Sequence, residues 1–228
     1  MKSKKNCIAI IPARSGSKRI KNKNIKIIKN LPVIAHTIIA AKKSKVFDYI
    51  MVSTDCKKIA KIAKLYGANI DFIRPRNLSN DTTKTIDVIK HAIKFYKNKF
   101  KYSCCLYPAS PFIKYQNIKY AYRILKKKKH DMVLTLQEFP SLIQRALKVK
   151  NSKVQWHNSY YKDKNSNSLK KYYYDGGQFY FGESEKFLKK KNIIDKKTFP
   201  IILKKFENID INDYDDWNFA KKLLERFK

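Results

Sequence analysis

Residues 8–24 read Ile-Ala-Ile-Ile-Pro-Ala-Arg-Ser-Gly-Ser-Lys-Arg-Ile-Lys-Asn-Lys-Asn. A short apolar run stops at Pro12, and a loop of small and basic residues follows it and ends at Lys23 and Asn24. In α/β proteins a buried strand that leads into such a loop presents backbone N–H groups and cations to phosphates. The stretch therefore predicts the first strand of a parallel sheet, followed by a loop for which a nucleotide is the first ligand to consider.

The loop contains neither of the common glycine-rich nucleotide motifs. A Walker A motif needs Gly, four further residues and then Gly-Lys, and Ile11 stands where its first glycine would be. The Rossmann pattern Gly-x-Gly-x-x-Gly is also absent. The phosphate hypothesis rests instead on the concentration of cations, and a solvated, lysine-rich loop is the alternative.

Strand and helix patterns alternate through residues 7–136. We expect strands over 7–11, 49–53, 70–73, 103–107 and 131–136, and helices over 32–43, 55–66, 82–96 and 116–126. Such alternation predicts an α/β fold with a Rossmann-like, mostly parallel sheet covered by helices on both faces. Because ligands bind beyond the carboxyl ends of parallel strands, four loops should meet at one rim: 12–24, 53–55, 74–82 and 107–112.

The pattern changes after Leu136. Residues 138–172 show no long helical pattern and several aromatic residues, and we interpret them as an insertion with a hairpin that serves as a substrate lid or an oligomer contact. A turn and a strand are expected over 172–181, and a short strand tip over 209–211.

The last helix is expected to start at a cap formed by Asn212 or Asp213. Its inner face should carry the apolar residues Trp217, Ala220, Leu224 and Phe227.

The charge of the chain is extreme, with 52 Lys and Arg against 18 Asp and Glu and a formal net charge of +34. Such a charge favours binding to nucleic acid through phosphate contacts. The excess lysine, however, comes with many Ile, Asn and Tyr, whose codons are A- and T-rich, and it is spread over every expected helix. We interpret the charge as genome composition and predict no nucleic-acid partner, since no recognition motif is visible. A basic nucleic-acid-binding protein is kept as the remote alternative.

Two further patterns bear on location and metal chemistry. No apolar run reaches the roughly 18 residues of a membrane-spanning helix, and the N-terminal apolar segment is too short for a signal peptide. We therefore expect a cytoplasmic protein that does not contact a membrane. The cysteines lack the spacing of a zinc site, and we expect buried, reduced thiols at Cys7, Cys104 and Cys105.

Acidic residues, scarce elsewhere, cluster near the C-terminus. Asp213, Asp215 and Asp216 are explained by the favourable effect of negative charge in the first turn of a helix. Asp210 differs, because it lies between two isoleucines at an expected strand end, where a carboxylate needs a cation. Mg²⁺ held by one or two carboxylates together with substrate phosphates would meet that need.

Two of the five glycines stand together in Asp175-Gly176-Gly177. The pattern indicates either a tight turn or a close backbone approach to a ligand, with Asp175 or Gln178 touching it. The sequence does not separate these alternatives.

Taken together, these segments resemble the cytidylyltransferases that activate nonulosonic acids, the CMP-sialic acid synthetase family. The resemblance covers nearly the whole chain and runs in order through residues 11–24, Val52-Ser-Thr-Asp55, Arg74-Pro75 with Asp81-Thr82, Leu106-Tyr-Pro-Ala-Ser-Pro111, and Ile209-Asp210 with Asp215-Asp216-Trp217. It implies a fold of the nucleotide-diphospho-sugar transferase type, with a single cytidylyltransferase domain over residues 1–228 and 138–172 as a lid or dimerisation segment.

Within the family, Cys104–Phe112 and Tyr174–Tyr180 are similar to the pseudaminic acid branch. Asn208 replaces the first Asp of the C-terminal motif in many members, so metal binding rests more heavily on Asp210. Tyr174 and Asn165 stand where that branch commonly has His and Arg. Sialic, legionaminic and 3-deoxy-octulosonic acids therefore remain alternative substrates.

The resemblance implies a reaction in which CTP and a nine-carbon 2-keto sugar acid give a CMP-sugar and pyrophosphate, for surface glycan or flagellin glycosylation. The resemblance further implies that the anomeric hydroxyl attacks the α-phosphorus directly, that Mg²⁺ is the cofactor and that the enzyme is a homodimer.

The resemblance also implies a set of site residues. The implied catalytic residues are Arg14, Lys23 and Asp210, with Asp210 as the metal ligand. The implied nucleotide-binding residues are Ala13, Arg14, Ser15, Ser17, Lys18, Lys23, Asn24, Arg74, Asp81 and Thr82. The implied sugar-binding residues are Tyr107, Ser110, Asp175 and Gln178.

Overall fold

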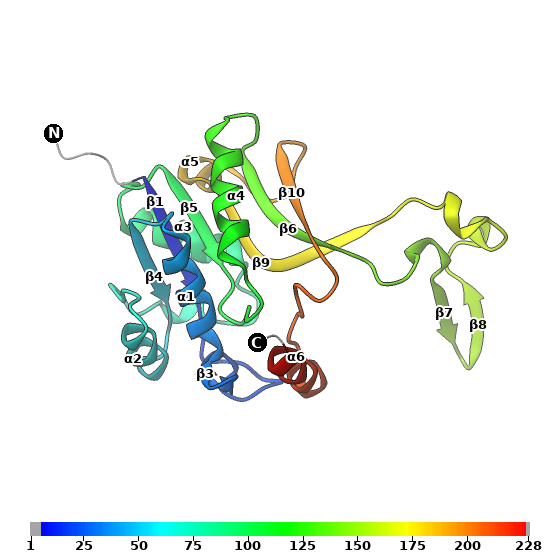
Figure 1. Cartoon of the computed structure of the whole chain (residues 1–228), viewed down its shortest axis with the longest axis horizontal. Helices are drawn as coiled ribbons and strands as arrows, with labels where there is room; N and C mark the ends of the chain where they lie inside the picture. The colour runs from blue at the N-terminus through cyan, green and yellow to red at the C-terminus, as the bar shows by residue number, and fades with distance from the viewer. Residues whose placement is uncertain (1–5, 227–228) are drawn as a thin grey trace.

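The computed structural model describes residues 6–226 (Figure 1), so Phe227 of the expected last helix lies outside the described residues. A six-stranded sheet has the order β10-β6-β9-β5-β1-β4. Its strands are β1 (Cys7–Pro12), β4 (Tyr49–Ser53), β5 (Tyr102–Leu106), β6 (Met132–Glu138), β9 (Tyr173–Glu183) and β10 (Thr198–Leu203).

The sheet is mostly parallel, as predicted. β1 runs parallel to both β4 and β5, and β10 runs parallel to β6. β9 lies between β5 and β6 and is antiparallel to both. The carboxyl ends of β1, β4, β5 and β6 consequently point to the same rim.

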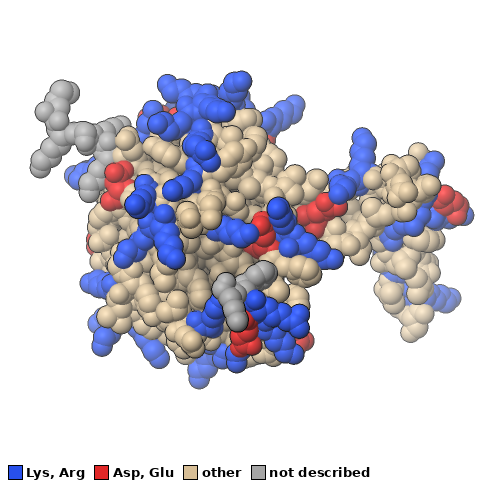
Figure 2. All heavy atoms as spheres, viewed as in Figure 1, with Lys and Arg blue, Asp and Glu red and all other residues tan. Residues whose placement is uncertain are grey.

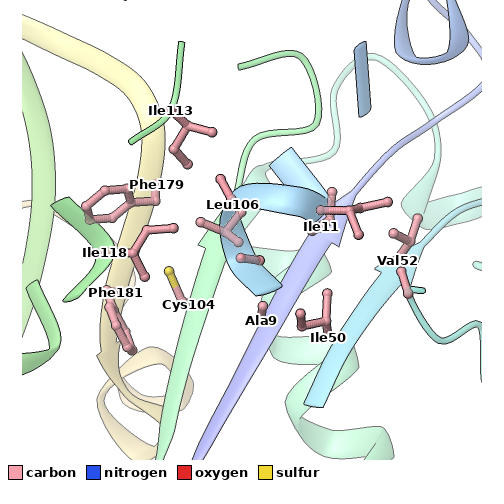
Figure 3. Close-up of a cluster of buried hydrophobic side chains, with 14 of the residues drawn as sticks. Ala9, Ile11, Ile50, Val52, Cys104, Leu106, Ile113, Ile118, Phe179 and Phe181 are labelled. Carbon is pink, nitrogen blue, oxygen red and sulfur yellow. The ribbon is translucent and has the colours of Figure 1, made fainter. Parts of the chain in front are cut away.

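Helices cover both faces of the sheet because its central strands are apolar on both sides. In β1, Cys7, Ala9 and Ile11 face one layer, while Ile8 and Ile10 face the other. The first layer contains α1 (Val33–Ser44), α2 (Lys57–Leu65) and α4 (Tyr115–Lys126), and the second contains α3 (Thr85–Phe95) and α5 (Ser184–Lys189). Figure 3 shows the first layer, where Ile118 and the two phenylalanines of β9 pack around Cys104.

The last helix, α6 (Tyr214–Arg226), forms a separate cluster beyond the rim. Its Trp217, Ala220 and Leu224 pack against the segment that follows the basic loop. That segment contains the short helix η1 (Lys23–Ile25) and the small hairpin β2 (Ile27–Ile28) and β3 (Leu31–Pro32). Asp213 caps α6, since its carboxylate accepts a hydrogen bond from the Asp216 N–H at 2.9 Å.

The structure differs from the sequence-based expectations in four places. Residues 70–73 form no strand, and only isolated bridges at Asn69 and Ile73 contact β4 and the residue after it. Residues 209–211 form no strand. The third helix starts at Thr85 instead of residue 82, because the Asn80 side chain accepts the N–H groups of the next two threonines and holds a turn. The elements α5 and β10 were not anticipated from the sequence.

Residues 139–172 form an arm that extends away from the sheet (Figure 1). It contains the expected hairpin, β7 (Leu147–Lys150) and β8 (Lys153–Trp156), and the short helices η3 (Ile143–Arg145), η4 (Ser159–Tyr161) and η5 (Ser166–Ser168). Every residue of β7 and β8 is exposed.

Basic side chains are scattered over the body and the arm in the face that Figure 2 presents, instead of forming one band. Within residues 6–226, no helix combines the length and the apolar character needed to cross a membrane. The cysteines are free, and burial raises the pKa of the Cys7, Cys104 and Cys105 thiols, as expected for inert reduced thiols.

Gly182 of β9 tests the packing of the central sheet. A Cβ at this position would lie 2.2 Å from the Met132 sulfur and 2.8 Å from the Asp131 carbonyl oxygen. We expect Gly182→Ala to reduce the free energy of unfolding by about 1–3 kcal/mol through overpacking, measured by urea denaturation. Gly16→Ala is the control, because a Cβ there meets nothing within 4 Å, and equal midpoints for the two variants would contradict the expectation.

Candidate active site

Three of the four expected loops, 12–24, 74–82 and 107–112, line a cavity of about 310 Å³ at the rim, and the fourth, 53–55, contacts the first loop without lining the cavity. Its wall is formed by the basic loop after β1, the segment that contains η2 (Arg76–Leu78), the start of α3 and the residues after β5. Five cationic side chains line it: Arg14, Lys18, Arg19, Lys23 and Arg74. This concentration of positive charge makes the cavity a site for a polyanion.

The basic loop is held in shape by hydrogen bonds from and to Ala13, Asp55 and Asn24. Ala13 is buried and donates its N–H to the Ser53 carbonyl at 2.9 Å, continuing the contact of β1 with β4. The Asp55 carboxylate accepts hydrogen bonds from the Ser15 N–H at 2.8 Å and the Ser15 hydroxyl at 2.7 Å. The buried Asn24 amide donates to the Arg14 carbonyl at 2.9 Å. Asp55, a member of the second motif, thus fixes the loop.

Two cations of the loop are paired with one carboxylate in the cavity. Asp81 Oδ1 lies 2.6 Å from Arg14 Nη1, and its Oδ2 lies 2.6 Å from Lys18 Nζ. Hydrogen bonds from Lys18 and Arg14 hold the pKa of Asp81 below its usual value, so the carboxylate stays ionised. Ser17 lines the cavity beside this group. Thr82, in contrast, donates its hydroxyl to the side-chain Oδ1 of Asn80 at 2.9 Å and does not line the cavity.

Arg74 approaches from the opposite wall and is almost fully buried. Its Nε donates to the Ser79 hydroxyl at 3.1 Å, and burial lowers its pKa. An arginine remains cationic even with such a shift, because its reference pKa is about 12.5 or above. Arg74 therefore supplies a fixed positive charge with a defined orientation.

Lys23 joins the basic loop to the acidic C-terminal motif. Its Nζ donates to the Ile211 carbonyl at 2.8 Å, across 188 positions of the sequence. Burial lowers the pKa of Lys23, while the negative charges of Asp210 and Asp216 act in the opposite direction. Lys23 is therefore a partly desolvated ammonium group near a carboxylate, placed to interact strongly with further anions.

Asp210 is linked by hydrogen bonding to Asn212, which lines the cationic cavity. The Asn212 amide donates to Asp210 Oδ2 at 2.8 Å, and its oxygen accepts from Arg19 Nη2 at 2.8 Å. Asp216, the nearest other acid of the motif, is committed to the start of α6, since its Oδ2 accepts the N–H groups of Asn212 and Asp213.

The donor set around Asp210 fits Mg²⁺ only in part. Across the described residues 6–226, no group of three or more His, Cys, Asp or Glu side chains could hold a metal ion. Asp210 supplies one hard oxygen ligand, which contacts Asn212 of the cationic cavity without lining that cavity itself. Mg²⁺ keeps several waters and is commonly held by one or two carboxylates plus substrate phosphates, so this set fits a metal that arrives with its phosphate ligands.

A second cavity, of about 860 Å³, lies next to Asp210 at the base of the arm. Asp210 and Tyr174 both line it, and burial together with the charge of Asp210 raises the pKa of Tyr174. Aromatic rings and two lysines form much of the remaining wall: Phe139, Phe206, Phe219, Lys204 and Lys205. Such a mixture of rings and polar groups suits a sugar-sized ligand that carries an acid group.

The expected sugar-binding residues occupy different environments. Tyr107 lines the first cavity and donates to the Tyr180 hydroxyl at 3.2 Å, and burial raises the pKa of Tyr107 to about 12. Asp175 accepts hydrogen bonds from Tyr180 and, at 2.9 Å, from the Gly177 N–H. Ser110 is buried and donates to the Gly177 carbonyl at 3.3 Å.

Gln178 is fully buried and donates to the Glu207 carbonyl at 2.7 Å. Asn208, which replaces an acid of the motif, donates to the Gly176 carbonyl. Gly177 has φ +57°, a left-handed conformation that favours glycine, and the Asp175 carboxylate accepts its N–H. Residues 175–177 thus make a local turn within an irregularity of the continuous strand β9, where its register with β6 shifts, instead of the separate turn before a strand that the sequence predicts. Ser110, Gln178 and Asn208 hold that turn against the segment that carries Asp210.

Sequence reasoning missed several residues that line the two cavities. Thr83 and Thr85 line the first, and they were placed inside a helix that begins later than expected. Arg19 was counted in the basic loop, but its contact with Asn212 had no local signal in the sequence. Lys204 and Lys205 were missed because they follow β10, which the sequence pattern did not reveal.

Comparison with known proteins agrees with this geometry. The sequence matches a family model described as cytidylyltransferase over residues 8–226. It is 34% identical over 223 residues to a pseudaminic acid cytidylyltransferase of Campylobacter jejuni, with 96% of each chain covered. It is also 34% identical to a CMP-N,N'-diacetyllegionaminic acid synthase of Legionella pneumophila, again over 96% of each chain.

Among solved structures, a CMP:2-keto-3-deoxy-manno-octonic acid synthetase complexed with CTP has a TM-score of 0.73 and 14% identity, covering 98% of this chain and 100% of the other. This similarity supports the same fold.

Proposed function

The chain belongs to the cytidylyltransferase family, and on that premise we propose that it transfers the cytidylyl group of CTP to pseudaminic acid and releases pyrophosphate. The observation that carries this proposal is the cavity at the rim of β1, which Arg14, Lys18 and Lys23 line and where Lys23 interacts with the charge of Asp210. The choice of sugar is supported by the pseudaminic acid relative and by the segment Tyr174–Tyr180. Legionaminic acid is the second candidate, because a relative named for it is equally similar.

The chemistry needs no nucleophile from the protein. The anomeric hydroxyl oxygen bonds to the α-phosphorus and gives its proton to solvent, while the bond from the α-phosphorus to the oxygen bridging to the β-phosphate breaks. The electron pair of that bond leaves with pyrophosphate. Arg14, Lys18 and Lys23 neutralise charge on the phosphates, and Ser17 and Asn24 support the loop that positions them.

Asp210 would hold Mg²⁺ against oxygens of the triphosphate, where the ion supplies charge neutralisation. Lys23 would lie on the same side of the phosphates, because it is hydrogen-bonded one residue away at Ile211. Asp210 and the Lys23 ammonium group would thus act on the triphosphate from the same side, because the Lys23–Ile211 hydrogen bond holds them close together.

The two cavities would divide the substrates. Arg74 and the turn that contains Asp81 and Thr82 would lie beside cytosine and ribose. The sugar acid would take the second cavity, with Asp175 in the turn beside it and Lys204 or Lys205 near its carboxylate. Tyr107, Ser110 and Gln178 would then act on the sugar chiefly by holding the turn.

We expect the enzyme to work as a cytoplasmic homodimer without a nucleic-acid partner. The hairpin of the arm supports the dimer, because its cross-strand pairs Leu147–Trp156 and Val149–Val154 form an exposed apolar face. Val149 is 74% exposed and Val154 is 63% exposed, and a second copy of the chain would bury them.

A panel of sugars tests the reaction. With CTP and Mg²⁺, pyrophosphate release should show the highest kcat/KM for pseudaminic acid, compared with N,N'-diacetyllegionaminic, N-acetylneuraminic and 3-deoxy-manno-octulosonic acids. A preference for another sugar would correct the substrate. If no sugar released pyrophosphate, and RNA but not CTP raised the Tm, the nucleic-acid alternative would replace the proposal.

Asp210→Asn tests the metal ligand. We expect kcat to fall by about 100- to 1,000-fold, since a charge that neutralises the triphosphate through the metal is lost, while circular dichroism and Tm stay unchanged. Asp215→Asn removes the same charge from an exposed position in the first turn of α6 and should be nearly neutral. Near-normal turnover of Asp210→Asn would remove the metal role.

The arm is tested by oligomeric state. Val149→Asp with Val154→Asp places two charges on the apolar face and should convert a dimer to monomers in sedimentation equilibrium. Lys148→Asp with Gln155→Asp places the same acids on the opposite face of the hairpin and should leave the dimer intact. A wild-type protein that is monomeric at tens of micromolar would contradict the proposal.

A further inference from the structure

The cavity proposed for the triphosphate contains an anion supplied by the chain. Asp81 lines it together with Arg14 and Lys18, and its two oxygens each lie 2.6 Å from one of these cations. A phosphate group binds the same way, with separate oxygens on separate donors. Asp81 therefore occupies two of the cations that a triphosphate would need.

The contacts of Asp81 are of the reversible kind. The side chains of Asp81, Arg14 and Lys18 are 44%, 37% and 81% exposed, so the two ion pairs are solvated. Exposed ion pairs contribute little free energy and are readily exchanged for others. A ligand with several negative charges can displace such a carboxylate.

The turn around Asp81 does not depend on those ion pairs. Asn80 holds it, because its side-chain Oδ1 accepts the N–H groups of Thr82 and Thr83 and its side-chain Nδ2 donates to the Asn77 backbone carbonyl. The Asp81 side chain can consequently leave the two cations while the turn and the start of α3 keep their structure.

We infer that Asp81 is an internal competitor for the phosphate-binding cations, which it holds in the free enzyme and retakes as pyrophosphate leaves. This role rests on the proposed function, since it takes Arg14 and Lys18 as triphosphate ligands. Every ligand that uses both cations must displace Asp81, so CTP and pyrophosphate bind less tightly than the cations alone would allow. The return of Asp81 favours release of pyrophosphate, which carries no other group to hold it in the site.

The experiment compares Asp81→Asn with a matched control, Asp131→Asn. Asp131 also bridges two cations, lying 3.2 Å from Lys186 and 3.6 Å from Lys190, but it precedes β6 and so lies at the end of the sheet opposite to the rim. Both variants make the same change in net charge. The affinities of the full-length enzyme for pyrophosphate and for CTP are measured by isothermal titration calorimetry, and pyrophosphate is also titrated as a product inhibitor.

We expect Asp81→Asn to bind pyrophosphate and CTP about three- to tenfold more tightly than the wild type, and Asp131→Asn to change neither affinity. Asp81→Ala should give the same gain, which separates loss of the carboxylate from new contacts of the amide. Tm values without ligand confirm that each variant is folded.

Equal tightening in both aspartate-to-asparagine variants would assign the effect to long-range charge and overturn the inference. Weaker CTP binding by Asp81→Asn would mean that Asp81 contacts the bound nucleotide, and would overturn it as well. If the wild type bound neither CTP nor pyrophosphate, the proposed function itself would fail, and the two failures are thereby distinguished.

Discussion

Several cations line one cavity of this protein, and their mutual repulsion must be offset by nearby acids. Arg14, Lys18, Lys23 and Arg74 converge there in a protein that already carries a net charge of +34. Each unit charge at such short range interacts strongly with its neighbours in a partly desolvated site. A few acids offset this repulsion. Asp81 pairs with Arg14 and Lys18, and the negative charges of Asp210 and Asp216 act on Lys23.

The scarcity of acids explains how each one is used. Asp48 accepts the N–H groups at the start of β1, Asp55 fixes the basic loop, and Asp216 with Asp213 defines the start of α6. These carboxylates bind backbone donors, where a hydrogen bond to an ionised acceptor stabilises more than a neutral one. Most of the described lysines are exposed to solvent, while the acids named here accept hydrogen bonds that fix the start of a strand, a loop or a helix.

The sequence predicted the elements whose signal is local. The apolar runs in β1, β4 and β5, and the amphipathic patterns of α2 and α4, gave bounds within about two residues of those observed. Residues 70–73 look like a strand because they are partly apolar, yet they sit beyond the edge strand and pair only at isolated bridges. The convergence of the loops followed from parallel topology. The burial of Ser110 and Gln178 could not be predicted from the sequence. It depends on the turn at Gly177 inside the antiparallel strand β9 and on the segment at Asn208, 30 residues beyond Gln178.

The arm and the second cavity are built on the same two strands, β6 and β9. β6 leads into the arm and β9 returns from it, and the register of this pair shifts between Leu134 and Leu136, beside the turn at Asp175 (Figure 1). The same two strands line the second cavity through Gln137, Glu138 and Tyr174. A displacement of the arm would therefore also displace side chains of that cavity, because both are carried by β6 and β9.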